Sequence, residues 1–317
     1  MINLALSWQQ AGISAGCLAA AAAVAARSRR PRLVAAAGFA RETAVVLALY
    51  GLWQLAGRFV LMGPEGAIDR GQWIWQAERA VHLPSETVVQ QAFLPHPLIV
   101  QALNLYYAGL HFVVVIGCLI WVYVWHRQRY PRVRTTLVLF TAGALLIQFI
   151  PVAPPRMLPG DGMIDTAARY GQSVYGSVAG FNADQLSAMP SVHVGWALLA
   201  ALVIVEISRS RWRWLALAYP ALTMLAVVVT ANHYWLDGLA AALLLALALA
   251  VQRASRALYR RLGGRRRAGQ PEDRPAPVLA PASTSSARWQ AAWRPGRTSR
   301  SAGTSVAHRS MASGQRG

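Results

Sequence analysis

The sequence predicts an all-α protein, a polytopic bundle of membrane-spanning helices. Of its 317 residues, 55% are hydrophobic and only 14% are charged, which is unusual for a soluble domain of this size. The apolar residues also gather into runs long enough to cross a bilayer as helices, which takes roughly 17 to 25 residues. We therefore expect seven crossings, at residues 8–26, 43–62, 98–125, 134–152, 191–207, 214–232 and 236–252.

The first of these runs, 8–26, is the weakest because it consists largely of alanine, which is barely apolar. It differs from a signal peptide, in which positive charge precedes the apolar core, because the arginines of "RSRRPR" follow it. We expect it to be one additional N-terminal membrane helix in front of a six-helix bundle.

The basic charge is concentrated near the C-terminus. Residues 253–317 carry 14 Arg and 2 acidic residues, a net charge of +12, whereas residues 1–252 carry 17 Arg and 10 acidic residues, a net charge of +7. The last segment is rich in Arg, Pro, Ala and Ser without a helical or strand period, a composition typical of disorder. The predicted parts are an N-terminal helix with its cytoplasmic connector (1–42), a six-helix membrane domain (43–252) and a disordered tail (253–317).

The placement of arginine orients the bundle, because cytoplasmic connectors carry an excess of basic residues. The Arg-rich connectors are 27–32, 126–134 and 208–213, and they alternate with the nearly neutral or mixed connectors 63–97, 153–190 and 230–235. One topology satisfies every loop, with the N-terminus outside and the tail in the cytoplasm. We expect a bacterial plasma membrane protein whose unusual polar loops lie on the outer face.

Three polar segments lie at the outer ends of the predicted helices. They are "PVAPPRMLPGDG" (151–162) with Arg156, "SAMPSVHVGWALL" (187–199) with His193, and "TANHYWLDGLAA" (230–241) with His233 and Asp237. An antiparallel bundle can bring all three segments to one depth. Because ionisable residues are costly within a membrane, such a cluster indicates a functional site.

The second segment contains a predicted helix start that can bind an anion. Proline is favoured at the first helical position, so Pro190 is expected to begin the fifth crossing. The amides of Ser191 and of the two residues after it would then point out of a helix N-terminus, which is an anion-binding arrangement. The Ser191 hydroxyl and the planar fork of Arg156 also suit phosphate oxygens.

His233 and Asp237 are four residues apart and share a helical face if the helix begins by residue 233. The carboxylate would fix the tautomer of the imidazole and leave the other nitrogen as acceptor or nucleophile, with His193 available as a general acid. This set supports phosphoryl transfer without a metal or another cofactor. Two histidines and a carboxylate could also bind a metal, but no further ligand stands beside them and Arg156 would repel a cation.

Other polar residues are expected near this site. Asn104, Tyr107 and His111 fall on one helical face, where they either line a pocket or make structural hydrogen bonds between helices. Ser187 and Asn232 flank the two histidine motifs and are expected in the same surroundings.

The motifs "PPR", "PSVH" and "HYWLD" together resemble the three signature motifs of the type 2 phosphatidic acid phosphatase superfamily, the integral-membrane lipid phosphatases and phosphotransferases related to vanadium haloperoxidases. The longer strings "APPRML", "AMPSVHVGWAL" and "NHYWLDG" are similar to the inositol-phosphotransferase-like branch, which includes fungal inositol phosphorylceramide synthases. The resemblance runs from about Trp73 to Leu247. It implies a six-helix lipid-phosphatase-like core plus one extra N-terminal helix.

The resemblance implies a role for each motif residue. Arg156 takes the position of the phosphate-binding arginine, and Ser191 would hold the phosphate. His193 would protonate the leaving group. His233 would be the nucleophile that forms a phosphohistidine, with Asp237 orienting it.

The sequence also departs from the phosphatase pattern. Phe149 stands where the pattern has a lysine, seven residues before the arginine, and Val227 stands where it has an arginine, six residues before the nucleophile. Fewer cations would hold a doubly charged phosphomonoester less well, which favours phosphodiesters or headgroup exchange.

The expected function is that of an integral-membrane phosphoesterase or phosphotransferase acting on a lipid phosphate or phospho-headgroup. Its partners would be membrane lipids, and we expect no nucleic acid. Hydrolysis and transfer both stay open, as do the lipid and the oligomeric state. The alternative is a non-catalytic transporter or lipid-binding scaffold that uses the same polar cluster as an anion site.

Overall fold

The computed structural model of the chain describes residues 6–56, 66–172 and 183–268. Those residues form helices joined by loops, and the single β feature among them is an isolated bridge between Val152 and Ser187. The predicted all-α fold is therefore confirmed. The chain divides into two units, Met1–Gly264 and Arg265–Gly317, and all the contacts below belong to the first. The tail predicted to be disordered was 253–317, and its part beyond residue 268 lies outside the described residues.

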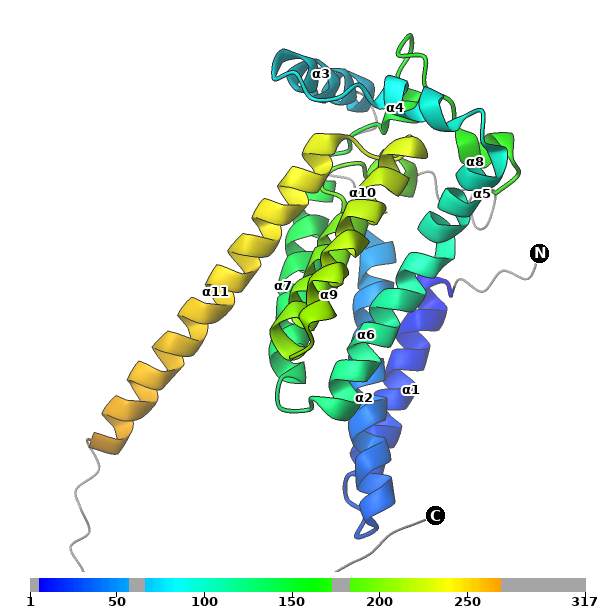
Figure 1. The fold of residues 1–317 in the computed structure, drawn as a ribbon. Coiled ribbons are helices and arrows are strands. Elements are labelled where there is room, and N and C mark those ends of the chain that lie inside the picture. Colours follow the sequence, from blue (N-terminus) through cyan, green and yellow to red (C-terminus); the bar gives the residue numbers. More distant parts are fainter. Residues whose placement is uncertain (1–5, 57–65, 173–182, 269–317) are drawn as a thin grey trace, which may run out of the picture. The chain divides into compact units, whose positions relative to one another are not determined.

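Each predicted crossing corresponds to helical structure (Figure 1). The helices are α1 (Trp8–Ala25), α2 (Pro31–Ala56), α5 (Pro97–Leu105), α6 (His111–Trp125), α7 (Tyr130–Gln148), α9 (Val192–Ile207), α10 (Ala218–Val229) and α11 (Trp235–Ala268). A π-helix, η1 (Tyr106–Leu110), joins α5 to α6, and a 3-10 helix, η4 (Arg211–Leu217), precedes α10.

Four helical stretches in the described part of the chain are long and apolar enough to cross a membrane by length and composition. They are Pro31–Leu52, Pro97–Trp125, Arg211–Val229 and Trp235–Arg261. Helix α9 is apolar but shorter. The fold is thus an all-α bundle of the kind expected for a membrane protein.

Two predicted domain limits fall inside helices. Helix α2 begins at Pro31 rather than near residue 43, because proline suits the first helical position and needs no amide partner there. Helix α11 continues past residue 252 to Ala268, since Arg, Ala and Leu are good helix formers and extending a helix costs little once it exists.

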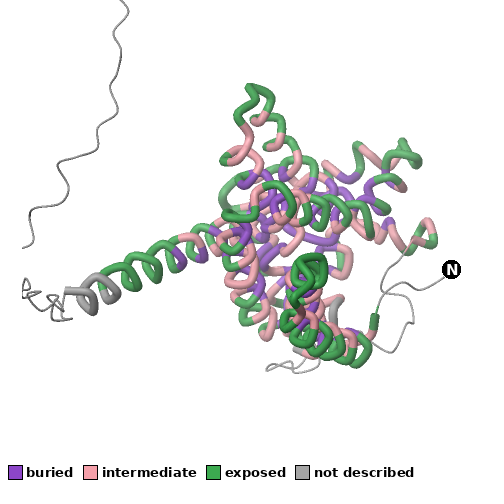
Figure 2. Tube along the Cα trace, turned by 90° about the horizontal axis from the view of Figure 1, so that it is seen from below, coloured by how far each residue is buried: buried purple, intermediate pink, exposed green. Residues whose placement is uncertain are grey.

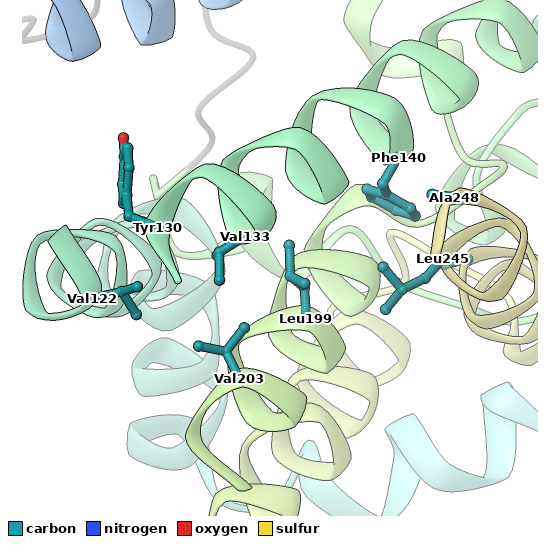
Figure 3. Close-up of a cluster of buried hydrophobic side chains, with 9 residues drawn as sticks. Val122, Tyr130, Val133, Phe140, Leu199, Val203, Leu245 and Ala248 are labelled. Atoms are coloured by element: carbon teal, nitrogen blue, oxygen red, sulfur yellow. The ribbon is translucent and has the colours of Figure 1, made fainter. Parts of the chain in front are cut away.

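A cluster of buried apolar side chains joins α7, α9 and α11. Phe140 from α7, Leu199 from α9 and Leu245 from α11 belong to this cluster (Figure 3). Gly195 permits the packing, because a Cβ atom at that position would lie 1.9 Å from Cζ of Phe140. The helix that carries His193 is therefore set close against α7.

The long helices present apolar side chains outward and bury polar ones. Large apolar side chains that are more than half exposed include Leu98, Val113, Leu146 and Leu243. Figure 2 shows exposed residues continuing along α11 toward its C-terminal end. Buried polar residues include Asn104, His111, Thr223, His233 and Asp237. A soluble protein would keep such polar groups outside, so this distribution supports helices that face lipid.

The two ends of the bundle differ in character. Helices α3 (Ala67–Ala80), α4 (Glu86–Phe93) and α8 (Thr166–Arg169) gather at one end (Figure 1). Near the other end of α9, Glu206 accepts a hydrogen bond from Arg132 at 2.7 Å. This ion pair links the Arg-rich connector 126–134 to the end of α9 that precedes the connector 208–213, so both connectors lie away from the end that carries the polar loops.

Candidate active site

The three polar segments of the sequence meet in the structure through main-chain hydrogen bonds. These bonds run from Ala188 N to Val152 O (3.3 Å), from Arg156 N to Ala231 O (3.1 Å) and from Ser191 N to Asp237 O (3.2 Å). The side chain of Tyr234, which is fully buried, adds a hydrogen bond from its hydroxyl to Ala153 O at 2.8 Å. Because these hydrogen bonds join main-chain atoms, they fix the positions of the three motifs relative to one another.

His233 lies between α10 and α11, and its ring is held at Nδ1. That nitrogen is 2.6 Å from the carbonyl oxygen of Ala188 and 3.2 Å from Oδ2 of Asp237. Both oxygens are acceptors, so the neutral ring carries its proton on Nδ1 and keeps a lone pair on Nε2. His233 is 5% exposed and Asp237 is fully buried.

His233 and Asp237 are in contact, but they do not share a helical face as their spacing led us to expect. Helix α11 begins at Trp235, after His233, and Oδ2 of Asp237 also accepts a hydrogen bond from Tyr234 N at 2.9 Å. An acidic side chain at the third helical position that accepts from the residue before the helix is half of a capping box. Asp237 therefore fixes the start of α11 and the orientation of His233 together.

Ser191 is the N-cap of α9, and its Oγ accepts a hydrogen bond from the amide three residues later at 3.4 Å. Pro190 consequently precedes the cap and does not occupy the first helical position, because serine at the cap satisfies a helix amide that would otherwise lack a partner. The Ser191 amide is taken by the carbonyl of Asp237. The predicted anion cradle is thus corrected to the amides of Val192 and His193, the first two helical residues, which have no partner within the helix.

Four rings surround His193. The centroids of Tyr107, His111, Phe112 and His233 lie 4.3, 4.9, 5.3 and 6.2 Å from that of His193. Nε2 of His193 is buried and has no hydrogen-bond partner among the described residues. A buried nitrogen of this kind is costly unless a ligand supplies the partner.

The side chain of Arg156 lies in the 3-10 helix η2 (Pro155–Met157) and is 4% exposed. Its Nη1 donates a hydrogen bond to Oδ1 of Asn232, whose amide nitrogen donates to Oγ1 of Thr230 at 2.8 Å. Its Nε lies 3.5 Å from Oδ2 of Asp165. Asn232 therefore aims the guanidinium, and Asp165 provides a counter-ion that the sequence motifs do not reveal.

A family model described as the PAP2 superfamily matches residues 72–251, the region that holds all of these side chains. The chain belongs to the PAP2 superfamily. The family inferred from the three motifs is thereby confirmed, and membership supports a phosphatase-type phosphoesterase, because PAP2 members are phosphatases or phosphotransferases. No curated protein and no solved structure matches the chain.

The cluster of Arg156, Ser191, His193, His233 and Asp237 is called the PAP2 site below. Two of the three polar residues expected on one helical face lie at this site. Tyr107 and His111 contact the ring of His193, as described above. Asn104 instead accepts a hydrogen bond from Oγ1 of Thr166 at 2.9 Å and so holds the loop after η2. The π-helix η1 lies between Asn104 and His111, and its wider winding shifts the angular positions that a regular α-helix would give.

His111 is fully buried and has a hydrogen-bond partner on another helix. Its Nδ1 lies 2.9 Å from the hydroxyl oxygen of Tyr219 in α10. Its Nε2 is buried and has no hydrogen-bond partner among the described residues. This places a third histidine at the PAP2 site, next to His193. The hydrogen bond between Tyr219 and His111 could not be predicted, because the sequence around Tyr219 is apolar.

Ser187 contributes its main chain to the PAP2 site, in the isolated bridge with Val152. No hydrogen bond of its side chain is described. A role of the Ser187 hydroxyl in binding a headgroup therefore stays a prediction.

Glu78 is a buried residue of α3 that sequence reasoning missed. Its Oε1 accepts a hydrogen bond from Leu236 N at 2.7 Å, at the start of α11. Burial and the neighbouring carboxyl of Glu86 raise the pKa of Glu78 to about 9, so the group is protonated at neutral pH. A carboxyl group in an amphipathic helix normally lies in solvent, and for that reason this contact could not be predicted from the residue pattern.

No group of three or more His, Cys, Asp or Glu side chains that could hold a metal ion occurs in the described part of the chain. The side chains that do converge are two histidines with a third nearby, the carboxylates of Asp237 and Asp165, and one arginine. Such a set can bind an oxyanion and move a proton. A site that works without metal stays a prediction.

Proposed function

We propose that this PAP2 protein is an integral-membrane enzyme that hydrolyses a lipid phosphate or transfers its phosphate-bearing group, through a phosphohistidine and without a metal or another cofactor. The observation that carries the proposal is the state of His233. Its Nδ1 lies between two acceptor oxygens, so Nε2 keeps the lone pair that a nucleophile needs. Nε2 of His193, unpartnered among the described residues, is available as the proton donor beside it.

In the first step, Nε2 of His233 attacks phosphorus and forms an N–P bond while the P–O bond to the leaving group breaks. The protonated ring of His193 gives its proton to the departing oxygen, which leaves as an alcohol. Arg156 and the amides at the start of α9 stabilise the charge on the phosphate oxygens. Asp237 stabilises the positive charge that develops on the His233 ring.

In the second step, the oxygen of water or of an acceptor alcohol attacks phosphorus. The N–P bond breaks and its electron pair returns to Nε2 of His233. His193 takes the proton of the incoming oxygen, so both histidines return to their starting states. Water as acceptor makes the enzyme a hydrolase, and an alcohol makes it a transferase.

The finer proposal is headgroup transfer of the inositol-phosphotransferase-like type. It is supported by the burial of the histidines and Asp237, since transfer needs a site from which water is excluded. The apolar residues Phe149 and Val227, in place of two cations, support a singly charged diester as substrate.

We also propose that the site lies on the outer face of a bacterial plasma membrane, with membrane lipids as substrates and the tail in the cytoplasm. The outward apolar surfaces of the long helices support insertion in a membrane. The Arg-rich connectors, which lie away from the site, support this orientation.

The test is turnover of lipids labelled at phosphorus by the purified full-length protein, with and without inositol or diacylglycerol as acceptor. We expect His233→Ala to lose at least about a thousandfold in turnover, as removal of a nucleophile does. The matched control is His96→Ala, an exposed histidine at the start of α5. Chelators should leave turnover unchanged.

Turnover by His233→Ala close to that of the parent protein, or loss of turnover on chelation, would contradict the proposal. If no lipid is turned over at all, the protein belongs with the non-catalytic anion-binding alternative. The product that carries the label distinguishes hydrolysis from transfer.

A further inference from the structure

We propose that Asp165 is a specificity-determining residue, which neutralises Arg156 so that the site selects singly charged phosphodiesters over doubly charged phosphomonoesters. The inference rests on the proposed function, because it concerns the same phosphate site. Its basis is the contact of 3.5 Å between Oδ2 of Asp165 and Nε of Arg156. A substrate phosphate that approaches this arginine meets a carboxylate already paired with it.

The position of Asp165 is fixed by its own loop. Oδ1 of Asp165 caps helix α8 by accepting a hydrogen bond from Ala168 N at 2.8 Å. The preceding residue, Ile164, is held on both sides by Gln90, which accepts from its amide at 2.8 Å and donates to its carbonyl at 2.9 Å. Gln90 is fully buried and also donates to Val229 O, in α10. The loop next to Asp165 is therefore fixed by buried contacts, and the Asp165 side chain, 35% exposed, is held by its cap and by Arg156.

The residue after Asp165 is anchored as well. Thr166 is fully buried, and its hydroxyl donates to Oδ1 of Asn104, in α5. Thr87 in α4 donates to the carbonyl of Asp161 at 2.8 Å. Anchors on both sides therefore fix the main chain of Asp165 near Arg156.

Two described residues at the phosphate site, Val227 and Asn232, carry no charge that would offset Asp165. Val227 is fully buried, and its carbonyl accepts a hydrogen bond from the backbone amide of His233 at 3.2 Å, so this uncharged residue adjoins the main chain of the nucleophile. Asn232, on the Nη1 side of Arg156, is neutral. A phosphodiester carries one negative charge and a monoester carries close to two. The unfavourable interaction with Asp165 is therefore about twice as large for the monoester.

The first test measures binding of two small probes to the full-length protein, methyl phosphate and dimethyl phosphate, at a pH of about 8. At this pH methyl phosphate is a dianion, because the second pKa of a phosphate monoester is about 6, whereas dimethyl phosphate is a monoanion. We expect Asp165→Asn to bind methyl phosphate about tenfold more tightly than the parent does. Dimethyl phosphate should gain only about threefold, the square root of that factor, since it carries half the charge.

Two further variants make the binding result specific. Asparagine and serine are both good helix caps, so Asp165→Asn and Asp165→Ser should keep α8 and should give the same change in the ratio of the two affinities. Asp161→Asn is the matched control, because Asp161 lies in the same loop and its carboxylate caps the amide of Met163 instead of pairing with Arg156. It should leave the ratio unchanged.

The second test measures turnover of phosphatidic acid against phosphatidylglycerol. The ratio of their kcat/KM values should rise about threefold in Asp165→Asn, the quotient of the two expected affinity gains. An unchanged ratio of probe affinities, or weaker binding of methyl phosphate, would overturn the role of Asp165. Altered probe binding in a protein that turns over no lipid would support the role of Asp165 in anion choice and overturn the proposed function alone.

Discussion

His193 and His233 are the same residue type at one site, and their different contacts support the different tasks proposed for them. His233 is fixed at Nδ1 by Ala188 and Asp237, as a nucleophile should be. His193 lies among aromatic rings with Nε2 unpartnered among the described residues, as suits a proton donor. A proton donor matters only when the leaving oxygen needs a proton, whereas a nucleophile is needed for every substrate. The choice of leaving group therefore separates the role of His193 from that of His233.

Replacement of His193 by glutamine should therefore depend on the leaving group. For a lipid with an alkyl alcohol as leaving group, turnover should fall by about 10² to 10⁴, the usual contribution of general acid catalysis. For a nitrophenyl ester the initial burst of nitrophenolate should fall less than about tenfold, because this leaving group needs no proton. Equal losses with both substrates would show that His193 is not the acid, and His233→Ala should abolish both reactions.

The residues that sequence reasoning found are those whose chemistry is unusual for their surroundings, such as Arg156 and the two histidines in apolar runs. The contacts of Asp165 and Glu78 were not predicted, because charged residues in loops and amphipathic helices are normally solvated. The partner of Glu78, Leu236, is distant in the sequence. The partner of Asp165, Arg156, is separated from it by a loop. Only the fold shows that these carboxyl groups meet functional elements.

Helix α9 depends on a glycine for its distance from α7. Replacement of Gly195 by alanine should lower the free energy of unfolding by about 1–3 kcal/mol, because the new Cβ would collide with the ring of Phe140. The apparent Tm in detergent measures this. Gly117→Ala in α6 is the control, since no atom lies within 4 Å of a Cβ at that position. An equal effect of the two substitutions would contradict the packing described for α9.

Helix α3 is tied to the start of α11 by Glu78. Because Glu78 is protonated at neutral pH, Glu78→Gln should keep both the hydrogen bond from Leu236 N and the stability, whereas Glu78→Ala should lose about 1–3 kcal/mol. Thermal unfolding of the two variants provides the measurement.

The stability of the parent should also depend on pH through Glu78. The pKa of Glu78 in the folded protein, about 9, is above the ordinary glutamate value of 4.5, so its contribution to stability is complete at low pH and is lost as pH rises from about 5 to about 9. Glu78→Gln should reduce this slope, because the amide does not titrate. A Glu78→Gln variant as unstable as Glu78→Ala, or with the slope of the parent, would contradict a protonated Glu78.

Apolar runs predicted the existence of every long helix, because burial in lipid requires them. The helix ends were less predictable, since they depend on single hydrogen bonds. Ser191 caps α9 and Asp237 closes the start of α11, which moved both starts from the expected positions. The π-helix η1 was not predicted, because periodicity does not report one inserted residue.

At the scale of the whole molecule, alternation of Arg-rich and neutral connectors predicts which face meets the cytoplasm. In a protein whose Cys17 and Cys118 are replaced by serine, we expect Gln91→Cys to react with a membrane-impermeant maleimide on intact cells. Gln128→Cys should react only after permeabilisation. Both glutamines are exposed, so they form a matched pair. The reverse labelling pattern would place the site on the cytoplasmic face.

The central claim, that His233 carries the phosphoryl group, is tested most directly by trapping the intermediate. The full-length protein is mixed with a substrate labelled at a phosphorus that stays on the enzyme, quenched within one turnover and digested. We predict label on the peptide that contains His233, with the stability in alkali and lability in acid of a phosphohistidine, and no label in His233→Ala. Turnover without a labelled protein, or label on another residue, would contradict the mechanism.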